Sequence, residues 1–198
     1  DQSEKFIDCN GNGNVELYYN NSKKLETSHD GGTLHGTWTG VGKVLQVVHT
    51  AKTDTFSESL GQGNLSGDTG LNVSITPSSS SNKILIIASV NMSCSNDNRN
   101  ATTLVRGGSA IDASRGDASN SNQRVSSASF NSSTSFMSHH SINFLDTANT
   151  TSAITYGMRL SHGRNSTATV YMNRAGSEAS GSDRMRAASF ITAMEIAA

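Results

Sequence analysis

Arginine and amide side chains gather in two polar stretches of this sequence, Ser95–Asn100 and Asp112–Arg124. A guanidinium group binds carboxylates through paired N–H donors, and an asparagine amide both donates and accepts hydrogen bonds. These groups suit the hydroxyls and anionic groups of polysaccharides, so we expect binding rather than bond cleavage. The candidate binding residues are Asn96, Asn98, Arg99, Arg115, Asp117, Asn120 and Arg124.

Possible metal-binding motifs are incomplete. Asp8, Asn10 and Asn12 match the first half of a calcium loop, but Tyr19 stands where the loop needs its glutamate, which favours a plain Asn-Gly turn. His139 and His140 are adjacent, so on a strand they point to opposite faces and cannot chelate one ion. Histidines from three chains meeting on an axis are the less favoured alternative. We therefore expect no metal and no cofactor.

Enzyme signatures are also missing. Gly36–Val44 fails the glycine spacing of a phosphate-binding loop, and Gly61–Gly67 misses the dinucleotide spacing by one residue. Carboxylates such as Asp54, Glu58 and Asp68 are plentiful, but their spacing neither shows nor forbids a glycosidase pair. The sequence favours a protein that is not an enzyme.

The composition narrows the class of protein. The 198 residues carry a net charge of -1 and few aromatic side chains, which gives no basis for nucleic-acid binding. Cys9 and Cys94 fall in different expected parts of the chain, so a disulfide between them is the less favoured reading. The chain opens on Asp1 without a targeting segment, which suggests a fragment or a processed product.

The most apolar run, Asn82–Ser93, predicts the central strand of the core. It is too short for a membrane-spanning helix, which needs roughly 20 apolar residues, so no membrane insertion is expected. Its first half predicts a strand buried on both faces, and its end, Ser89–Ser95, is expected to emerge toward solvent. The last strand is expected in the middle of a sheet or at an interface.

The pattern predicts an all-β chain in two parts. Residues 1–40 form short strands with too few apolar side chains for a core, which predicts a β-rich intertwined neck. Thr37–Gly42, with Trp38, is the expected hinge. Residues 41–198 predict an antiparallel β-sandwich or jelly-roll head with long polar loops at 112–134 and 175–184. Gly107-Gly108 predicts a two-residue hairpin turn. We expect head strands at 44–50, 54–58, 71–76, 83–93, 102–106, 109–111, 135–145, 153–160, 167–173 and 187–196.

Several segments, taken in order, resemble a module that recurs in virion structural and fibre proteins of marine bacteriophages, cyanophages among them. The neck segment is Gly13–Thr27, and the head segments are Gly42–Val48, Ile75–Leu85, Phe144–Asp146, Val170–Arg174 and Ile191–Ile196. The resemblance implies a homotrimeric fibre or spike located on the virion, which contacts other virion proteins through its N-terminal neck. It carries no catalytic residues.

From this resemblance we expect a non-enzymatic protein that attaches the particle to a glycan or protein of the host surface. Recognition usually resides in loops on a rigid scaffold, which places the receptor site in the two polar stretches. A capsid decoration protein is one alternative. A polysaccharide-degrading tail spike is another, and new reducing ends on a host polysaccharide would favour it.

Overall fold

The computed structural model describes residues 4–36, 43–96, 98–178 and 184–198. The chain divides into two compact units, Asp1–Val41 and Gly42–Ala198. The expected hinge with Trp38 lies outside the described residues. No helix in the described part is long and apolar enough to cross a bilayer.

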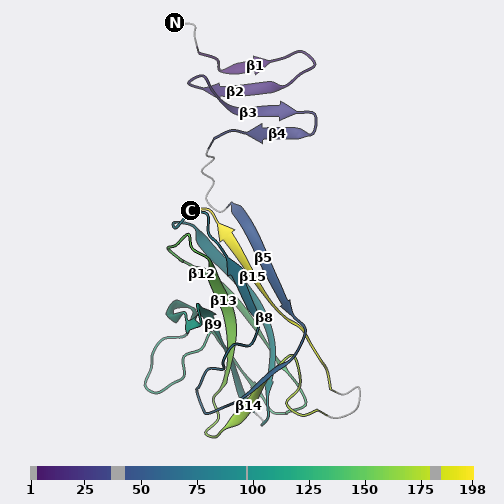
Figure 1. Cartoon of the computed structure of the whole chain (residues 1–198), viewed down its shortest axis with the longest axis vertical. Coiled ribbons are helices and arrows are strands. Elements are labelled where there is room, and N and C mark those ends of the chain that lie inside the picture. The colour runs from purple at the N-terminus through teal and green to yellow at the C-terminus, as the bar shows by residue number, and fades with distance from the viewer. Residues whose placement is uncertain (1–3, 37–42, 97, 179–183) are drawn as a thin grey trace. The chain divides into compact units, whose positions relative to one another are not determined.

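The N-terminal unit is a four-stranded antiparallel meander (Figure 1). Its strands are β1 (Ile7–Cys9), β2 (Val15–Tyr19), β3 (Ser22–Ser28) and β4 (Gly31–Leu34). Asn20 and Asn21 connect β2 to β3, both with positive φ. Asparagine tolerates that conformation, and a tight two-residue hairpin turn requires it twice.

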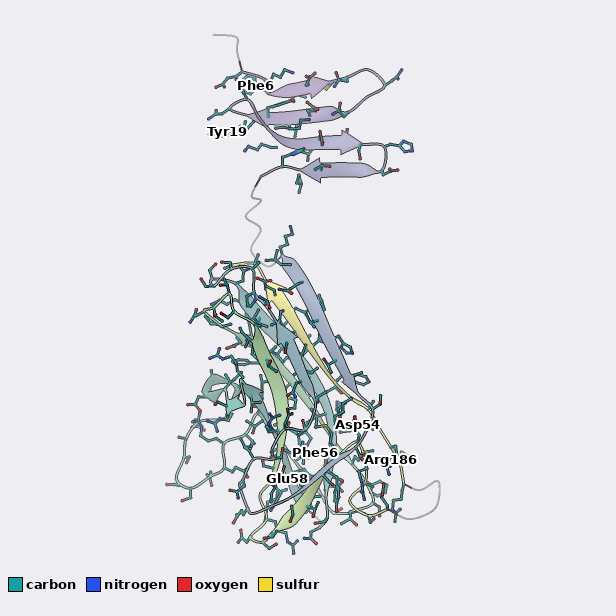
Figure 2. All side chains as sticks on the ribbon, in the orientation of Figure 1. Phe6, Tyr19, Asp54, Phe56, Glu58 and Arg186 are labelled. Atoms are coloured by element: carbon teal, nitrogen blue, oxygen red, sulfur yellow. The ribbon has the colours of Figure 1, made fainter. Side chains whose placement is uncertain are left out.

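One face of this sheet is apolar. Ile7 pairs with Leu17, Leu17 with Leu25, and Leu25 with Leu34. These four residues form a line across all four strands, here called the N-terminal row. Ile7 is 63% exposed and Leu34 is 53% exposed, so the chain by itself leaves the row open to solvent. Phe6 and Tyr19 add two exposed rings (Figure 2).

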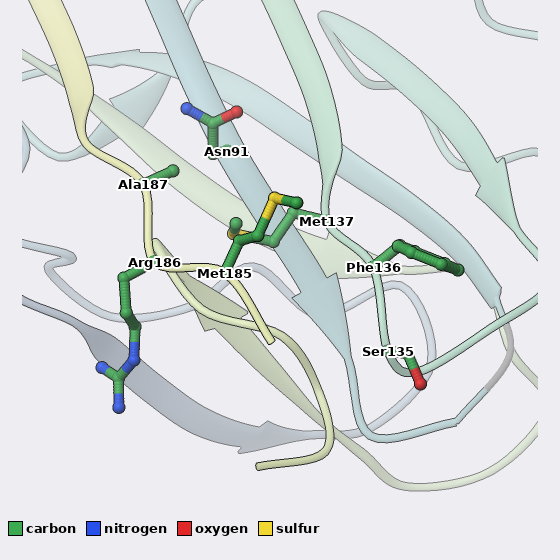
Figure 3. A pocket seen from close by; sticks show the side chains of 7 residues that line it. All are labelled: Asn91, Ser135, Phe136, Met137, Met185, Arg186 and Ala187. Atoms are coloured by element: carbon green, nitrogen blue, oxygen red, sulfur yellow. The ribbon is translucent and has the colours of Figure 1, made fainter. Parts of the chain in front are cut away.

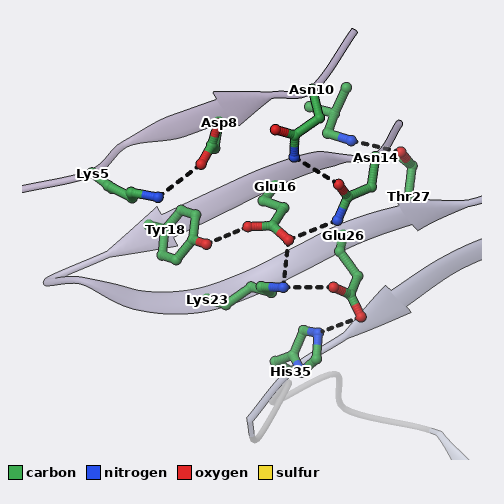
Figure 4. Close-up of polar contacts among 11 residues, drawn as sticks. Lys5, Asp8, Asn10, Asn14, Glu16, Tyr18, Lys23, Glu26, Thr27 and His35 are labelled. Atoms are coloured by element: carbon green, nitrogen blue, oxygen red, sulfur yellow. Dashed lines mark hydrogen bonds and ion pairs between the residues drawn. The ribbon is translucent and has the colours of Figure 1, made fainter. Parts of the chain in front are cut away.

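The opposite face is ionic (Figure 4). Lys23 Nζ lies 2.5 Å from Glu16 Oε1 and 2.7 Å from Glu26 Oε2, and the Tyr18 hydroxyl donates to Glu16. The hydrogen bond from Lys23, followed by that from Tyr18, lowers the pKa of Glu16 to about 2. The two faces of this sheet therefore differ sharply in polarity.

The C-terminal unit contains two antiparallel sheets with a common apolar core. The strands of the first sheet are β5 (Val44–Lys52), β6 (Phe56–Leu60), β8 (Lys83–Cys94), β12 (Ser138–Asp146), β14 (Ala168–Met172) and β15 (Ser189–Ile196). The strands of the second sheet are β7 (Asn72–Ile75), β9 (Asn98–Arg106), β10 (Ser109–Ala110), β11 (Ser127–Asn131) and β13 (Ile154–His162). The prediction of an all-β antiparallel fold is confirmed, and the two layers are consistent with a β-sandwich.

Strand β8 is the centre of the first sheet, as predicted. β12 pairs along one edge, while β15 and β14 share the other. The prediction of burial on both faces is wrong: Ile84 and Ile86 are buried, but Ile87 on the opposite face is 38% exposed. The prediction that Ser89–Ser95 emerges toward solvent is also wrong. Pairing with β14 keeps that end inside, and the buried Ser93 hydroxyl donates to Arg174 O.

The outward face of the first sheet carries a second apolar line. Met194 pairs with Val47 and Leu85, and Leu85 pairs with Leu145. These four residues form the outer row. Val47 is 56% exposed and Leu145 is 53% exposed. The outward side of the second sheet is polar instead: Ser74 bonds to Thr155, and Arg159 pairs with Asp68.

Several strand predictions from the sequence are confirmed, and one strand is missed. Gly107 and Gly108 both have positive φ and form the expected turn between β9 and β10. β15 lies between β5 and β8, within a sheet as predicted. The expected loop 112–134 contains strand β11 and a short 3-10 helix, Asp112–Ser114. β11 is serine-rich and its Phe130 is exposed, so the apolar pattern did not reveal it.

Glu195 joins the end of β15 to the segment that connects the two sheets. Its carboxylate accepts hydrogen bonds from Gln46 Nε2 at 2.7 Å, Asn82 Nδ2 at 2.6 Å, and both the amide and hydroxyl of Ser78 at 2.7 Å. Burial alone would raise the pKa of Glu195, but these donors outweigh it and lower the pKa to about 2. The charge is thus fully solvated by protein donors.

Replacing this carboxylate tests its role. We expect Glu195→Gln to lower the free energy of unfolding by about 2 kcal/mol, because an amide N–H group would then face hydrogen-bond donors at a position that is itself buried. The pKa of Glu195 in the folded state is depressed from 4.5. The greater stability of the parent over the variant should therefore be complete above about pH 4.5 and should vanish as the pH falls through about 2. Urea unfolding across this pH range measures both effects. The exposed Glu178→Gln serves as a control, and an equal loss there would contradict the assignment.

Candidate functional site

One of the two predicted binding stretches is not a loop. β9 begins at Asn98, paired with Asn131 of β11, soon after β8 ends at Cys94. Asn96 lies between the two strands, and Arg99 lies on β9. Asn100 is buried, with its Nδ2 donating to Ser138 Oγ. The sequence suggested a loop because Asn and Ser dominate there, but pairing with β11 extends the strand.

A polar hollow of about 630 Å³ lies at the Arg99 end of this strand. Four segments surround it: the turn after β6, the start of β9, the tip of the loop before β11, and the turn after β13. Small-molecule sites usually occupy about 300–1,000 Å³, so the size is adequate for a ligand. The lining residues are Gln62, Gly63, Arg99, Ser121, Asn122, Gln123 and Gly163.

Backbone hydrogen bonds and one glutamine hold these segments together. Gly63 N donates to His162 O at 3.0 Å, and Gly163 N donates to Arg99 O at 3.0 Å. Gln123 Nε2 reaches Ser161 Oγ at 2.7 Å, which pins the loop tip against β13. The hollow is therefore a fixed feature that combines groups distant in sequence.

Arg115 and Arg124 fasten their own loop and do not line the hollow. Arg115 pairs with Asp112, and Arg124 Nε donates to Gly116 O at 2.7 Å while its Nη2 donates to Asp112 O at 3.2 Å. The ion pair with Arg115, followed by the charge of Arg124, lowers the pKa of Asp112. Both guanidinium groups are thus directed to groups of their own loop, although the sequence predicted them to be receptor-binding residues.

The remaining predicted residues lie at the tip of the same loop. Asp117 and Asn120 are exposed, and Asn120 has a positive φ within a turn closed by Asn122 N and Ser119 O. Neither lines the hollow. Of the predicted set, the structure brings only Arg99 to this site. No sequence pattern pointed to Gln62 or Gly163, whose roles depend on tertiary neighbours, whereas Gln123 lies within the predicted stretch Asp112–Arg124.

The histidines and the half-calcium motif are engaged elsewhere. His139 is exposed and His140 buried, on opposite faces as predicted. Burial, with the nearby His139, lowers the pKa of His140 to about 4, and its ring lies 3.1 Å from Ser127 Oγ and Ser129 Oγ. Asp8 pairs with Lys5. Within the described ranges no group of three metal-ligating side chains occurs.

A second pocket, which is mainly apolar, has a volume of about 310 Å³ (Figure 3). It lies beside Asn91 of β8, between the segment before β12 and the segment before β15, and exposes Phe136 and Met185. The lining residues are Asn91, Ser135, Phe136, Met137, Met185, Arg186 and Ala187. Lacking an array of polar groups that converge on a ligand, this pocket is the weaker candidate for recognition.

Comparison with known proteins adds no identification. No protein-family model matches the chain, and a search of curated proteins also finds no match.

The two kinds of arginine should behave differently on substitution. We expect Arg124→Ala to speed hydrogen exchange and proteolysis in the loop 112–124, because it removes three polar contacts that hold that loop. Arg99→Ala should leave loop protection unchanged, since the Arg99 side chain makes one long hydrogen bond within the described residues, to Gly163 outside that loop. Hydrogen exchange followed by mass spectrometry measures both. Equal loosening in the two variants would show that Arg124 does not fasten the loop.

Proposed function

We propose that this chain is a bacteriophage fibre or spike protein that attaches the virion to a host surface without enzymatic activity. The observation that carries the proposal is that the chain enters the C-terminal unit at one end and the polar hollow lies at the opposite end. The chain enters at Lys43, whose carbonyl accepts a hydrogen bond from Ala197 N, while the hollow lies at the other end of β8. The twelve residues of β8 span about 40 Å, so the end at which the chain enters is far from the end that carries the hollow.

We further propose that the protein assembles as a parallel homotrimer. The N-terminal row and the outer row both expose aligned apolar side chains, and burying such surface on copies of the same chain is favourable at about 25 cal/mol per Å². Strands β1–β4 already pair with one another. In this proposal the neck associates through its apolar face. The three-fold order follows the resemblance noted from the sequence.

The strand order supports a jelly roll as the specific fold of the head. One layer runs β5-β15-β8-β12 and the other runs β7-β13-β9-β11. Neighbours in each layer come from distant parts of the chain, and consecutive strands β7, β8 and β9 alternate between the layers. Such alternation is typical of double-sheet Greek-key folds.

The polysaccharide-degrading spike is less well supported. Glycoside hydrolysis uses two carboxyl groups on either side of the scissile bond. The lining of the hollow has no aspartate or glutamate among its described residues. A binding role fits this lining better.

Oligomer size tests the assembly. We expect the parent to show three times the 20.8 kDa of one chain in multi-angle light scattering. Leu85→Lys combined with Leu145→Lys should shift the head to smaller species, because charge on the outer row prevents its burial. Thr155→Lys, on the polar sheet, is the matched control. A monomeric parent would contradict the trimer.

Particle labelling and cell adsorption test the function. We expect an antibody against the head to mark distal fibre tips, and the purified trimer to adsorb to host cells without releasing new reducing ends from surface polysaccharide. Label spread evenly over the capsid would favour a decoration protein instead. New reducing ends would favour the degrading spike.

A further inference from the structure

Arg99 has no charged partner among the described residues, unlike several other arginines of the C-terminal unit. Arg106 pairs with Asp146, Arg159 pairs with Asp68, and the loop arginines pair with Asp112. In the described part of the chain, the Arg99 guanidinium makes a single hydrogen bond, 3.4 Å from Nη1 to Gly163 O. A guanidinium with most of its donors unused attracts an anion, above all a planar carboxylate.

The surroundings of Arg99 favour a sugar acid over a neutral sugar or an apolar ligand. Ser121 and Asn122 lie exposed in the lining, and their side chains make no hydrogen bond within the described residues. They offer a hydroxyl and an amide to ligand hydroxyls. Among the described residues, no aromatic ring and no carboxylate lines the hollow, so none of them would stack on a sugar face or repel an anion.

We propose that the hollow binds a uronic acid residue of an acidic polysaccharide. Arg99 binds the carboxylate, and Ser121 and Asn122 bind neighbouring hydroxyls. The inference rests on the attachment function and names the chemical class of the surface polysaccharide that this site takes.

Gly163 positions the charged group. A Cβ atom there would lie 3.2 Å from both Cβ and Cδ of Arg99, tighter than ordinary van der Waals contact. The absence of a side chain at this position lets the stem of Arg99 lie against the turn after β13. Gly163→Ala should therefore displace the guanidinium without removing its charge.

The test uses the purified protein with trigalacturonate and its methyl ester, in which an uncharged ester group replaces each carboxylate. We expect the acid to shift the backbone amide signals of Gly63 and Gly163, and to bind at least tenfold more tightly than the ester. Arg99→Gln should remove that difference, and Gly163→Ala should reduce it. Arg186→Gln removes an arginine outside the hollow, paired with Glu178, and should bind as the parent does.

Several results would overturn the inference: equal binding of acid and ester, no binding of either, unchanged binding by Arg99→Gln, or equal binding of a short polyglutamate. The last result would show an anion site without saccharide preference. A trimer that adsorbs to host cells but ignores both saccharides overturns this inference alone. Saccharide binding without any adsorption contradicts the attachment function and leaves the chemistry of the hollow standing.

Discussion

The alternation of side chains along β8 is the constraint on which the rest of the C-terminal unit depends. Every second residue from Ile84 onward enters the core, so Leu85 and Ile87 must face outward. Because β15 and β12 pair with β8 in a fixed register, their own apolar residues join Leu85 on that outward face. Core and outer row are thus two results of one register, and a slip of one residue would destroy both.

Period-two patterns in the sequence were sufficient to predict most strands and the central place of β8. The glycine pair Gly107-Gly108 was sufficient to predict its turn. They could not predict β11, whose side chains are mostly serine, or the solvent exposure of Ile87, since an apolar residue looks the same in a core and on an outer face. The candidate site was harder to predict from the sequence than the strands were. Arg99, Arg115 and Arg124 have the same chemistry, and only the fold shows that Arg99 lines the hollow whereas the other two pair with Asp112 in their own loop.

The two ends of the C-terminal unit have different chemistry for a structural reason. At the entry end, Glu195 gathers donors from β5 and from the segment between the sheets, so polar groups there satisfy one another. At the far end, turns meet around glycines that leave space for the hollow. Arg99 lies there and has no carboxylate partner among the described residues. A satisfied network stabilises the fold, whereas unsatisfied donors are available to a ligand.

The pairing of β5 with β15 also has a mechanical consequence. A pull transmitted through Lys43, and resisted at the hollow, acts along the length of β5. The backbone hydrogen bonds between β5 and β15 run across that direction, from Val44 to Lys52. The load is therefore borne in shear by the whole ladder at once, and the strand cannot be peeled away one bond at a time. The C-terminal unit therefore resists a pull on Lys43 most strongly along the direction of β5.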